Sequence, residues 1–301
     1  MGLLDGRVVI VTGGGRGIGR SHCLELARQG AKVVVNDLGV GLHGEESAET
    51  PGEAVVNEIK ELGGQAFADR TDVTDWQGVE DLVALSVDTF GGLDAVVNNA
   101  GIVRDRMITS MSEGDWDAVI GVHLKGTFNL TKHACDYWRG VGKAGGAVTG
   151  RIVNTTSGTG LFGNIGQAAY GAAKAAIANL TMITGMEMAR YGVACNAISP
   201  LAITRMTSGS ALAEEKEPEA GWDPLDPSNS SPLAAWLCSE EAGWLTGAVL
   251  RITGGTVSRV NPWTIDTAAR YESRSGEHLA VEEIGAGLRR AYGAIPRGIG
   301  S

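Results

Sequence analysis

Hydrophobic residues follow two alternating patterns along the chain. Short β-branched runs at residues 7–12, 32–36 and 151–155 are typical of buried strands. Stretches with apolar residues at helical spacing follow such runs, as in residues 20–29. The same patterns predict further strands at 65–68, 94–97, 193–199 and 248–252, and helices at 53–64, 74–92, 112–138, 168–191 and 233–238. The alternation predicts a doubly wound, mainly parallel sheet of Rossmann type, covered by helices on both faces.

No repeat or change of composition divides this pattern. We therefore predict one catalytic, dinucleotide-binding domain over residues 1–255. Within it, the stretch at about 201–231 contains an acidic, proline-containing part from 207 onward, which is typical of a mobile lid or surface loop. The remaining residues, 256–301, form an extension with one predicted helix at 281–292. The extension is too short for a domain, and we expect it to pack on the body or on a neighbouring subunit.

Composition narrows the possible functions. The net charge of −10 argues against a nucleic-acid partner. There is no apolar run of about 18 residues, which predicts no membrane span, and the first residues lack the pattern of a signal peptide. The four cysteines are isolated, which predicts free thiols in a reducing cytoplasm and no metal site.

A glycine-rich loop connects the first predicted strand to the first predicted helix. Residues 12–19 read TGGGRGIG, and Gly13, Gly17 and Gly19 let the backbone approach a ligand closely. The free N–H groups at the start of the helix favour a negatively charged group such as a pyrophosphate. Because the loop stands between a strand and a helix, it indicates dinucleotide binding more strongly than glycines alone would.

Asp37 follows the second strand and predicts the identity of the dinucleotide. A carboxylate at this place accepts hydrogen bonds from the hydroxyls of the adenosine ribose and repels a 2′-phosphate. The residues after Leu38 offer no Arg or Lys as far as Gly44, so NAD is favoured over NADP. Arg16 is the counter-argument, because a cation in the glycine loop can contact a 2′-phosphate.

Two other strand ends carry small or polar residues that suit a ligand crevice. Asp72, which precedes Val73, can accept a hydrogen bond from the adenine amino group. The fourth strand runs into Asn99, Ala100 and Gly101.

The candidate chemistry lies in residues 157–174. Ser157 is followed thirteen positions later by Tyr170 and four positions after that by Lys174. On a helix, i,i+4 spacing places the phenol and the ammonium on one face. A cation about 4 Å away favours the phenolate, so we expect Lys174 to lower the pKa of Tyr170 by up to about three units. The alternative is an amphipathic face with a solvated lysine, because the Tyr-Lys pair alone is common.

Over residues 5–255 the chain resembles the short-chain dehydrogenase/reductase superfamily. The resemblance lies in four features that occur in the family's order: TGGGRGIG, NNAG at 98–101, Ser157, and Tyr170-x-x-x-Lys174. The resemblance implies a nicotinamide cofactor, a small-molecule substrate and a homo-oligomer, often a tetramer. It implies Tyr170 as the acid/base, Lys174 as the ligand of the nicotinamide ribose, and Ser157 as the group that orients the substrate oxygen. The residues that it implies for the cofactor are Gly13, Gly17, Ile18, Gly19, Asp37, Asp72, Val73 and Asn99.

Two departures from the family pattern matter. The family usually has an asparagine in the long helix, where it holds a water in a proton relay. This chain has His123, for which a relay and simple packing are both open. The usual Pro-Gly after the sixth strand is Pro200-Leu201, and Thr204 comes one residue early, so its contact with the nicotinamide amide or phosphate is in doubt.

A narrower resemblance points to a substrate. Four stretches are similar to the (3R)-hydroxyacyl-CoA dehydrogenase unit of peroxisomal multifunctional enzyme type 2: VVVNDLG, RDRM at 104–107, VHLKG and SGTGLFGNIGQAAY. This implies NAD-linked oxidation of a 3-hydroxyacyl-CoA, or of a hydroxysteroid. Two other functions stay open: an NADPH-linked 3-oxoacyl ketoreductase, and a dinucleotide-binding regulator without catalysis.

Overall fold

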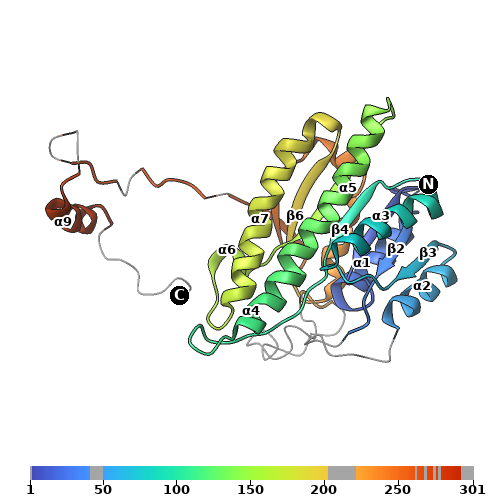
Figure 1. Cartoon of the computed structure of the whole chain (residues 1–301), viewed down its shortest axis with the longest axis horizontal. Helices are drawn as coiled ribbons and strands as arrows, with labels where there is room; N and C mark the ends of the chain where they lie inside the picture. Colours follow the sequence, from blue (N-terminus) through green and yellow to red (C-terminus); the bar gives the residue numbers. More distant parts are fainter. Residues whose placement is uncertain are drawn as a thin grey trace. The chain divides into compact units, whose positions relative to one another are not determined.

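The structure is a computed structural model of the chain. It describes residues 2–40, 50–202, 222–261, 263–267, 270–273, 276 and 279–292. The chain forms two compact units, Met1–Val260 and Asn261–Ser301. The first unit contains the whole sheet (Figure 1).

The first unit is built on one eight-stranded sheet of order β3-β2-β1-β4-β5-β6-β7-β8. Its strands are β1 (Val8–Thr12), β2 (Lys32–Asn36), β3 (Gln65–Asp69), β4 (Ala95–Asn98), β5 (Arg151–Thr155), β6 (Ala194–Leu201), β7 (Val249–Thr253) and β8 (Thr256–Val260). The pairs from β3 to β7 are parallel, and β8 pairs antiparallel with β7. The predicted Rossmann-type sheet is confirmed. The sequence analysis did not predict β8. Because β8 belongs to the sheet, the first unit ends at Val260, five residues beyond the predicted boundary at 255.

Alternate residues of each strand face two separate hydrophobic cores. In β1, Val9 and Val11 pack with one set of helices, whereas Val8 and Ile10 pack with another. The first core contains residues of α1 (Gly17–Arg28), α2 (Pro51–Glu61) and α8 (Ser231–Leu237); the second contains residues of α3 (Trp76–Phe90), α5 (Gly126–Lys143) and α7 (Ala168–Met188). Both faces of the sheet are thus covered, as the continuous apolar strand sequences require (Figure 1).

The helix predicted at 112–138 is not one regular helix. It consists of α4 (Glu113–Ile120), one turn of π-helix at Gly121–Lys125, and α5. Ser112 begins it with a capping box, since its hydroxyl accepts the Asp115 N–H at 3.1 Å. The wide π-turn contains His123, whose ring occupies the space that Gly101 leaves free: a Cβ on Gly101 would lie 2.3 Å from His123 Cε1. π-turns of this kind often mark functional sites.

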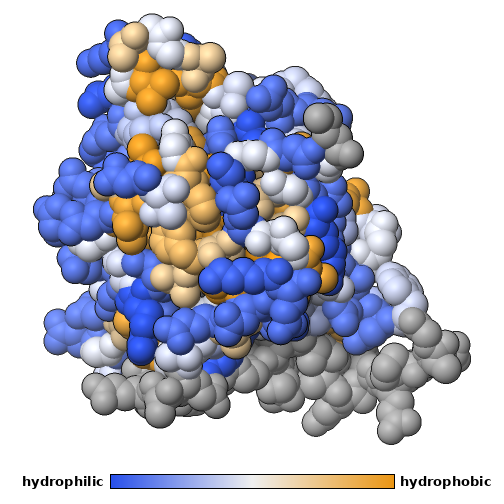
Figure 2. Space-filling view, turned by 90° about the vertical axis from the view of Figure 1, so that its right-hand side faces the viewer, coloured by the Kyte–Doolittle hydropathy of each residue, from blue (hydrophilic) through white to orange (hydrophobic). Residues whose placement is uncertain are grey.

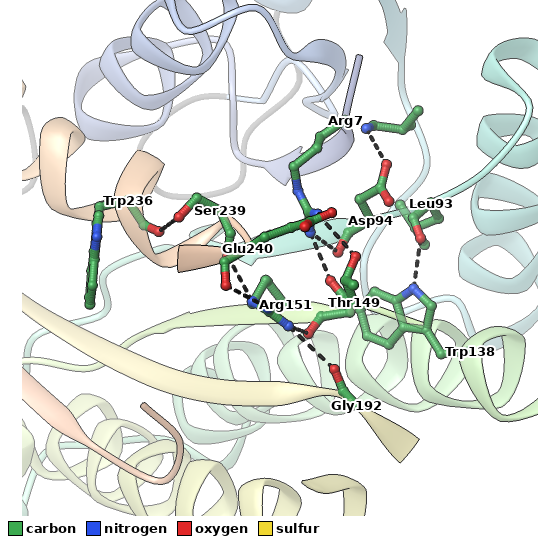
Figure 3. Close-up of polar contacts among 12 residues, drawn as sticks. Arg7, Leu93, Asp94, Trp138, Thr149, Arg151, Gly192, Trp236, Ser239 and Glu240 are labelled. Carbon is green, nitrogen blue, oxygen red and sulfur yellow. Dashed lines mark hydrogen bonds and ion pairs between the residues drawn. The ribbon is translucent and has the colours of Figure 1, made fainter. Parts of the chain in front are cut away.

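Two buried arginines connect the amino-terminal ends of the central strands (Figure 3). Arg7 donates to the Thr149 carbonyl at 2.8 Å and lies 3.5 Å from the Glu240 carboxylate. Arg151 donates to the backbone carbonyls of Ser239 at 2.8 Å and Glu240 at 3.2 Å. Burial, and then the charge of Arg7, lowers the pKa of Arg151. This network joins β1 and β5 to the segment after α8, at the sheet edge opposite the glycine loop.

Replacing Arg151 tests this network. Arg151→Met keeps much of the side-chain volume but leaves several buried carbonyls without a donor, so we expect a loss of about 3–5 kcal/mol in the free energy of unfolding. Urea denaturation measures it. The matched control is Arg139→Met, at a half-exposed arginine whose ion pair with Asp136 lies on the surface, and it should change stability by less than about 1 kcal/mol. Equal effects in the two variants would contradict the structural role of Arg151.

The second unit contains α9 (Val281–Tyr292), at the residues predicted for a helix. Tyr271 packs against this helix and donates its hydroxyl to Glu283 at 3.0 Å. In the described part of the chain, no helix combines the length and the hydrophobicity needed to cross a membrane.

Candidate active site

The glycine loop between β1 and α1 is packed so tightly that side chains do not fit. Gly13 has a φ of +62°, and a Cβ on Gly19 would lie 2.0 Å from the Gly13 carbonyl oxygen. Asn99 closes the loop from β4 by donating to the carbonyls of Thr12 and Gly13 at 3.0 and 3.1 Å. Arg16, at the N-cap of α1, makes no capping hydrogen bond with its side chain. The first N–H groups of the helix are therefore left for an anion.

The loop forms one wall of a cavity of about 400 Å³. Twelve of the residues predicted to bind the cofactor line this cavity: Gly13, Arg16, Gly17, Ile18, Gly19, Asp37, Leu38, Asp72, Val73, Asn99, Ala100 and Gly101. The described residues that line the cavity do not include Pro200, Ser157, Tyr170 or Lys174. Thr204 and most of the predicted lid at 201–231 lie outside the described residues.

Asp37 places a carboxylate at the end of β2 where the cavity begins. It accepts the N–H of Gly15 at 2.8 Å and the N–H of Gly39 at 2.9 Å, which fixes its orientation. A Cβ on Gly15 would lie 2.7 Å from this carboxylate. Two cations lie nearby: Arg16 donates to the Val40 carbonyl at 3.2 Å, and Arg70 donates to the Leu38 carbonyl at 3.3 Å. The sequence reading considered Arg16 but missed Arg70, because Arg70 follows the next strand in the chain.

Ser157, Tyr170 and Lys174 lie together at the carboxyl end of β5. Ser157 caps the short helix α6 (Gly158–Phe162), and its hydroxyl accepts the Thr159 N–H at 3.3 Å. Tyr170 and Lys174 share one face of α7, with Lys174 Nζ 5.7 Å from the centre of the Tyr170 ring. Lys174 is buried and donates to the Thr155 carbonyl at 2.6 Å. The predicted juxtaposition of phenol and ammonium is thus present in the fold.

The pKa values differ from the expectation that Lys174 makes the phenol acidic. Burial raises the pKa of Tyr170, a hydrogen bond with Ser157 opposes this effect, and the negative charge of Asp105 adds to it. Burial lowers the pKa of Lys174 to about 7, so its charge is only partial at neutral pH. The expected lowering of the Tyr170 pKa was therefore wrong: desolvation and the charge of Asp105 exceed the effect of the hydrogen bond with Ser157, and Lys174 makes no resolved contribution.

His123 packs edge-on against Tyr170, with ring centres 5.1 Å apart. Its Nε2 lies 2.8 Å from the Ile102 carbonyl oxygen, and its buried Nδ1 has no partner in the described part of the chain. Burial, and then the charge of Lys174, lowers the pKa of His123 to about 3. The imidazole is therefore neutral at any physiological pH.

A small apolar cluster connects the cavity to the three candidate catalytic residues. Tyr170 packs in this cluster with Ile102, Ala118 and Val122, and these three residues also line the cavity. The cavity therefore reaches the cluster that contains the Tyr170 side chain. The lining residues that sequence reasoning missed are Asn36, Val40, Thr71, Ile102, Ala118 and Val122. Asn36 could have been predicted from the sequence, because a polar residue ends an apolar strand just before Asp37. Nothing in the sequence marks the apolar residues as part of the cavity lining.

The chain is similar in sequence to known proteins, and in sequence and fold to a solved structure. A family model described as short chain dehydrogenase matches residues 7–216. The chain is 44% identical to hydroxyacyl-CoA dehydrogenase ChsB1 of Mycobacterium tuberculosis, over 95% of this chain and 88% of that protein. It is 40% identical to peroxisomal multifunctional enzyme type 2 of Drosophila melanogaster, over 97% of this chain but only 48% of that protein. A crystal structure of a short chain dehydrogenase from Mycobacterium avium superimposes with a TM-score of 0.86, at 49% identity over 98% of both chains.

Proposed function

The chain belongs to the short-chain dehydrogenase/reductase family, and from this premise we propose that it oxidises 3-hydroxyacyl-CoA thioesters with NAD as the hydride acceptor. The protein is an oxidoreductase that acts on CH–OH groups. The observation that carries the reaction type is the grouping of Ser157, Tyr170 and Lys174 beside the glycine-lined cavity. The substrate class is supported by the name of the mycobacterial relative, which is matched over nearly its whole length.

The residues around the cavity fit a nicotinamide dinucleotide. The glycine backbone and the uncapped start of α1 would hold the pyrophosphate, and Asp37 would hold the adenosine ribose. Asp72 and Val73 would contact the adenine, and Lys174 the nicotinamide ribose. Ala100 and Gly101 would let the backbone approach the dinucleotide closely, whereas Pro200 and Thr204 stay predictions for the nicotinamide amide or phosphate. Once bound, the nicotinamide ring supplies the hydride acceptor.

The protein side chains bind the alcohol and move its proton. The substrate hydroxyl would lie between Ser157 and Tyr170, with Ser157 fixing the oxygen and the phenol exchanging its proton. In the direction of ketone reduction, the protonated phenol is already the form that donates. His123 would take part as a neutral group, because burial lowers its pKa to about 3, and its buried Nδ1, which has no partner among the described residues, is left for a hydrogen bond.

Asp37 supports NAD over NADP, because its carboxylate would face a 2′-phosphate. We expect Asp37→Ala to lower the ratio of kcat/KM with NAD to that with NADP by at least tenfold, since the repulsion disappears while Arg16 and Arg70 stay. Steady-state kinetics with both cofactors measures the ratio. Asp81→Ala, which removes an exposed carboxylate on α3, is the matched control. A wild-type preference for NADP would overturn this assignment.

A second candidate is an NADPH-linked 3-oxoacyl ketoreductase. The contact of Arg70 with the Leu38 backbone favours it, because this contact brings a second cation near the ribose position. The third candidate, a regulator that binds a dinucleotide without catalysis, is disfavoured by the complete set of Ser157, Tyr170 and Lys174.

The deciding experiment measures NADH formation with a panel of (3R)- and (3S)-hydroxyacyl-CoA thioesters, hydroxysteroids and simple secondary alcohols. We expect turnover of a 3-hydroxyacyl-CoA with NAD that is at least tenfold more efficient than with the other classes. Faster reduction of 3-oxoacyl thioesters by NADPH would favour the second candidate. Dinucleotide binding without turnover of any alcohol would favour the third.

The assembly and the location of the protein are also proposals. Large apolar side chains are exposed on α3, α5 and α7, among them Trp76, Phe128 and Met186. Figure 2 shows an apolar strip between hydrophilic borders on one side of the molecule. Such exposure supports a homo-oligomer, a tetramer or a dimer, to which residues 261–301 of the predicted extension would contribute, since residues 256–260 form β8 of the sheet. The free cysteines, three of them buried, support a reducing compartment such as the cytoplasm.

A further inference from the structure

A chain of polar contacts links the loop after β4 to the segment that carries Ser157 and Tyr170. Asp105, in that loop, accepts the Gln167 side-chain N–H at 2.9 Å. The oxygen of the same amide accepts the Thr159 hydroxyl at 2.9 Å, and the Thr159 backbone N–H donates to Ser157 Oγ at 3.3 Å. Three separate segments therefore meet at one glutamine amide.

The backbone strengthens this junction. The Arg106 N–H donates to the Gly166 carbonyl at 2.8 Å, and Arg106 and Gln167 form an isolated parallel bridge. Gln167 is also the N-cap of α7, three residues before Tyr170. A shift of the loop would thus displace the start of the helix that positions the phenol.

An amide is the kind of side chain that satisfies the hydrogen-bonding partners of Gln167 at once. Asp105 only accepts hydrogen bonds, so it requires a donor. Asn164, whose side-chain N–H lies 2.9 Å from Gln167 Oε1, requires an acceptor. One amide supplies both, whereas a carboxylate would face Asp105 with two acceptors and like charges.

We propose that Asp105 and Gln167 form a latch that holds the loop at residues 102–110 against the turn of Ser157 and the start of α7, and so positions Ser157 and Tyr170 for the reaction. The catalytic half of this inference rests on the proposed function; the structural half does not. The charge of Asp105 also reaches the phenol, since it raises the pKa of Tyr170. Both residues act through others and are positioning residues.

A charge swap tests the latch. Gln167→Glu places two carboxylates opposite each other, so we expect exchange of the Arg106 amide hydrogen to quicken at least tenfold and kcat/KM to fall about tenfold. Adding Asp105→Asn restores a donor opposite Glu at position 167. The double variant should return both quantities to within about threefold of wild type.

Asp105→Asn alone separates charge from hydrogen bonding. Its side-chain oxygen still accepts the Gln167 N–H, so amide exchange should stay near that of wild type. Because a negative charge beside the phenol is removed, the rise of activity with pH that accompanies ionisation of the phenol in alcohol oxidation should move to lower pH. Asp117→Asn is the matched control: it removes an exposed carboxylate on α4 and should change neither quantity.

Hydrogen exchange requires no substrate, so it separates the two proposals. If the double variant exchanges as fast as Gln167→Glu, or if Gln167→Glu exchanges like wild type, the latch is wrong. If exchange follows the swap but kcat/KM does not, the positioning role is wrong. If the wild-type protein turns over no alcohol while exchange follows the swap, the proposed function fails and the latch stands as a structural restraint.

Discussion

Tyr170→Phe is expected to lower kcat/KM for alcohol oxidation and for ketone reduction by about 10³-fold or more, while the affinity for NAD stays within about twofold of wild type. General acid–base catalysis by one side chain typically contributes about 10²–10⁴-fold. The variant removes the only atom of Tyr170 that exchanges a proton. The ring keeps its packing in the cluster with Ile102, Ala118 and Val122.

The dinucleotide should bind Tyr170→Phe normally, because Tyr170 is not among the described residues that line the cavity. Fluorescence titration with NADH measures binding separately from turnover. Tyr191→Phe is the control: it removes a hydroxyl that accepts a hydrogen bond from Arg190 outside the site, and it should leave kcat/KM unchanged. Turnover by Tyr170→Phe within tenfold of wild type would show that another group moves the proton.

Much of the fold could be predicted because the relevant signals are local. β-branched runs mark β1, β2 and β5 in the sequence, and positive φ at Gly13 and Gly17 reflects a turn that only small residues enter. The spacing from Ser157 to Lys174 is likewise local, since a strand end and one helix determine it. These features require no knowledge of which strands become neighbours.

The missed features depend on contacts between distant segments. The π-turn that contains His123 accommodates the ring against Gly101 and Ile102, more than twenty residues earlier. Arg70 reaches the Leu38 backbone, next to Asp37, from the end of a neighbouring strand. The pKa of Tyr170 depends on burial, and helical spacing does not report burial. The spacing argument therefore predicted that Tyr170 and Lys174 share one face of a helix, but it gave the wrong direction for the shift of the Tyr170 pKa.

Lys174→Met is expected to make the protein more stable and much less active. Burial lowers the pKa of Lys174 from its ordinary value of about 10.5 to about 7, so the folded protein holds this cation at a cost. Removing the cation should raise the free energy of unfolding at pH 7 by about 2–4 kcal/mol, because the relief of the buried charge exceeds the loss of the hydrogen bond to the Thr155 carbonyl. The same change should lower kcat by about 10²–10³-fold, since the ammonium no longer orients bound groups beside Tyr170.

The stability cost of Lys174 should depend on pH in a direction that follows from its lowered pKa. Between pH 7 and about 10.5 the unfolded chain holds a proton on Lys174 that the folded protein has lost, so wild-type stability gains from this residue as pH rises. Below pH 7 both states are protonated and the full cost remains. The stability difference between Lys174→Met and wild type should therefore be largest at or below pH 7 and shrink toward pH 10.

Urea denaturation at pH 6, 7, 8 and 9 measures this difference, with Lys143→Met as the control at an exposed lysine. The control should show no trend with pH and no loss of turnover. A constant stability difference across the series would mean that Lys174 stays fully charged when buried. The experiment thus decides whether the protein keeps a costly buried lysine for its electrostatic effect or for its hydrogen bonds.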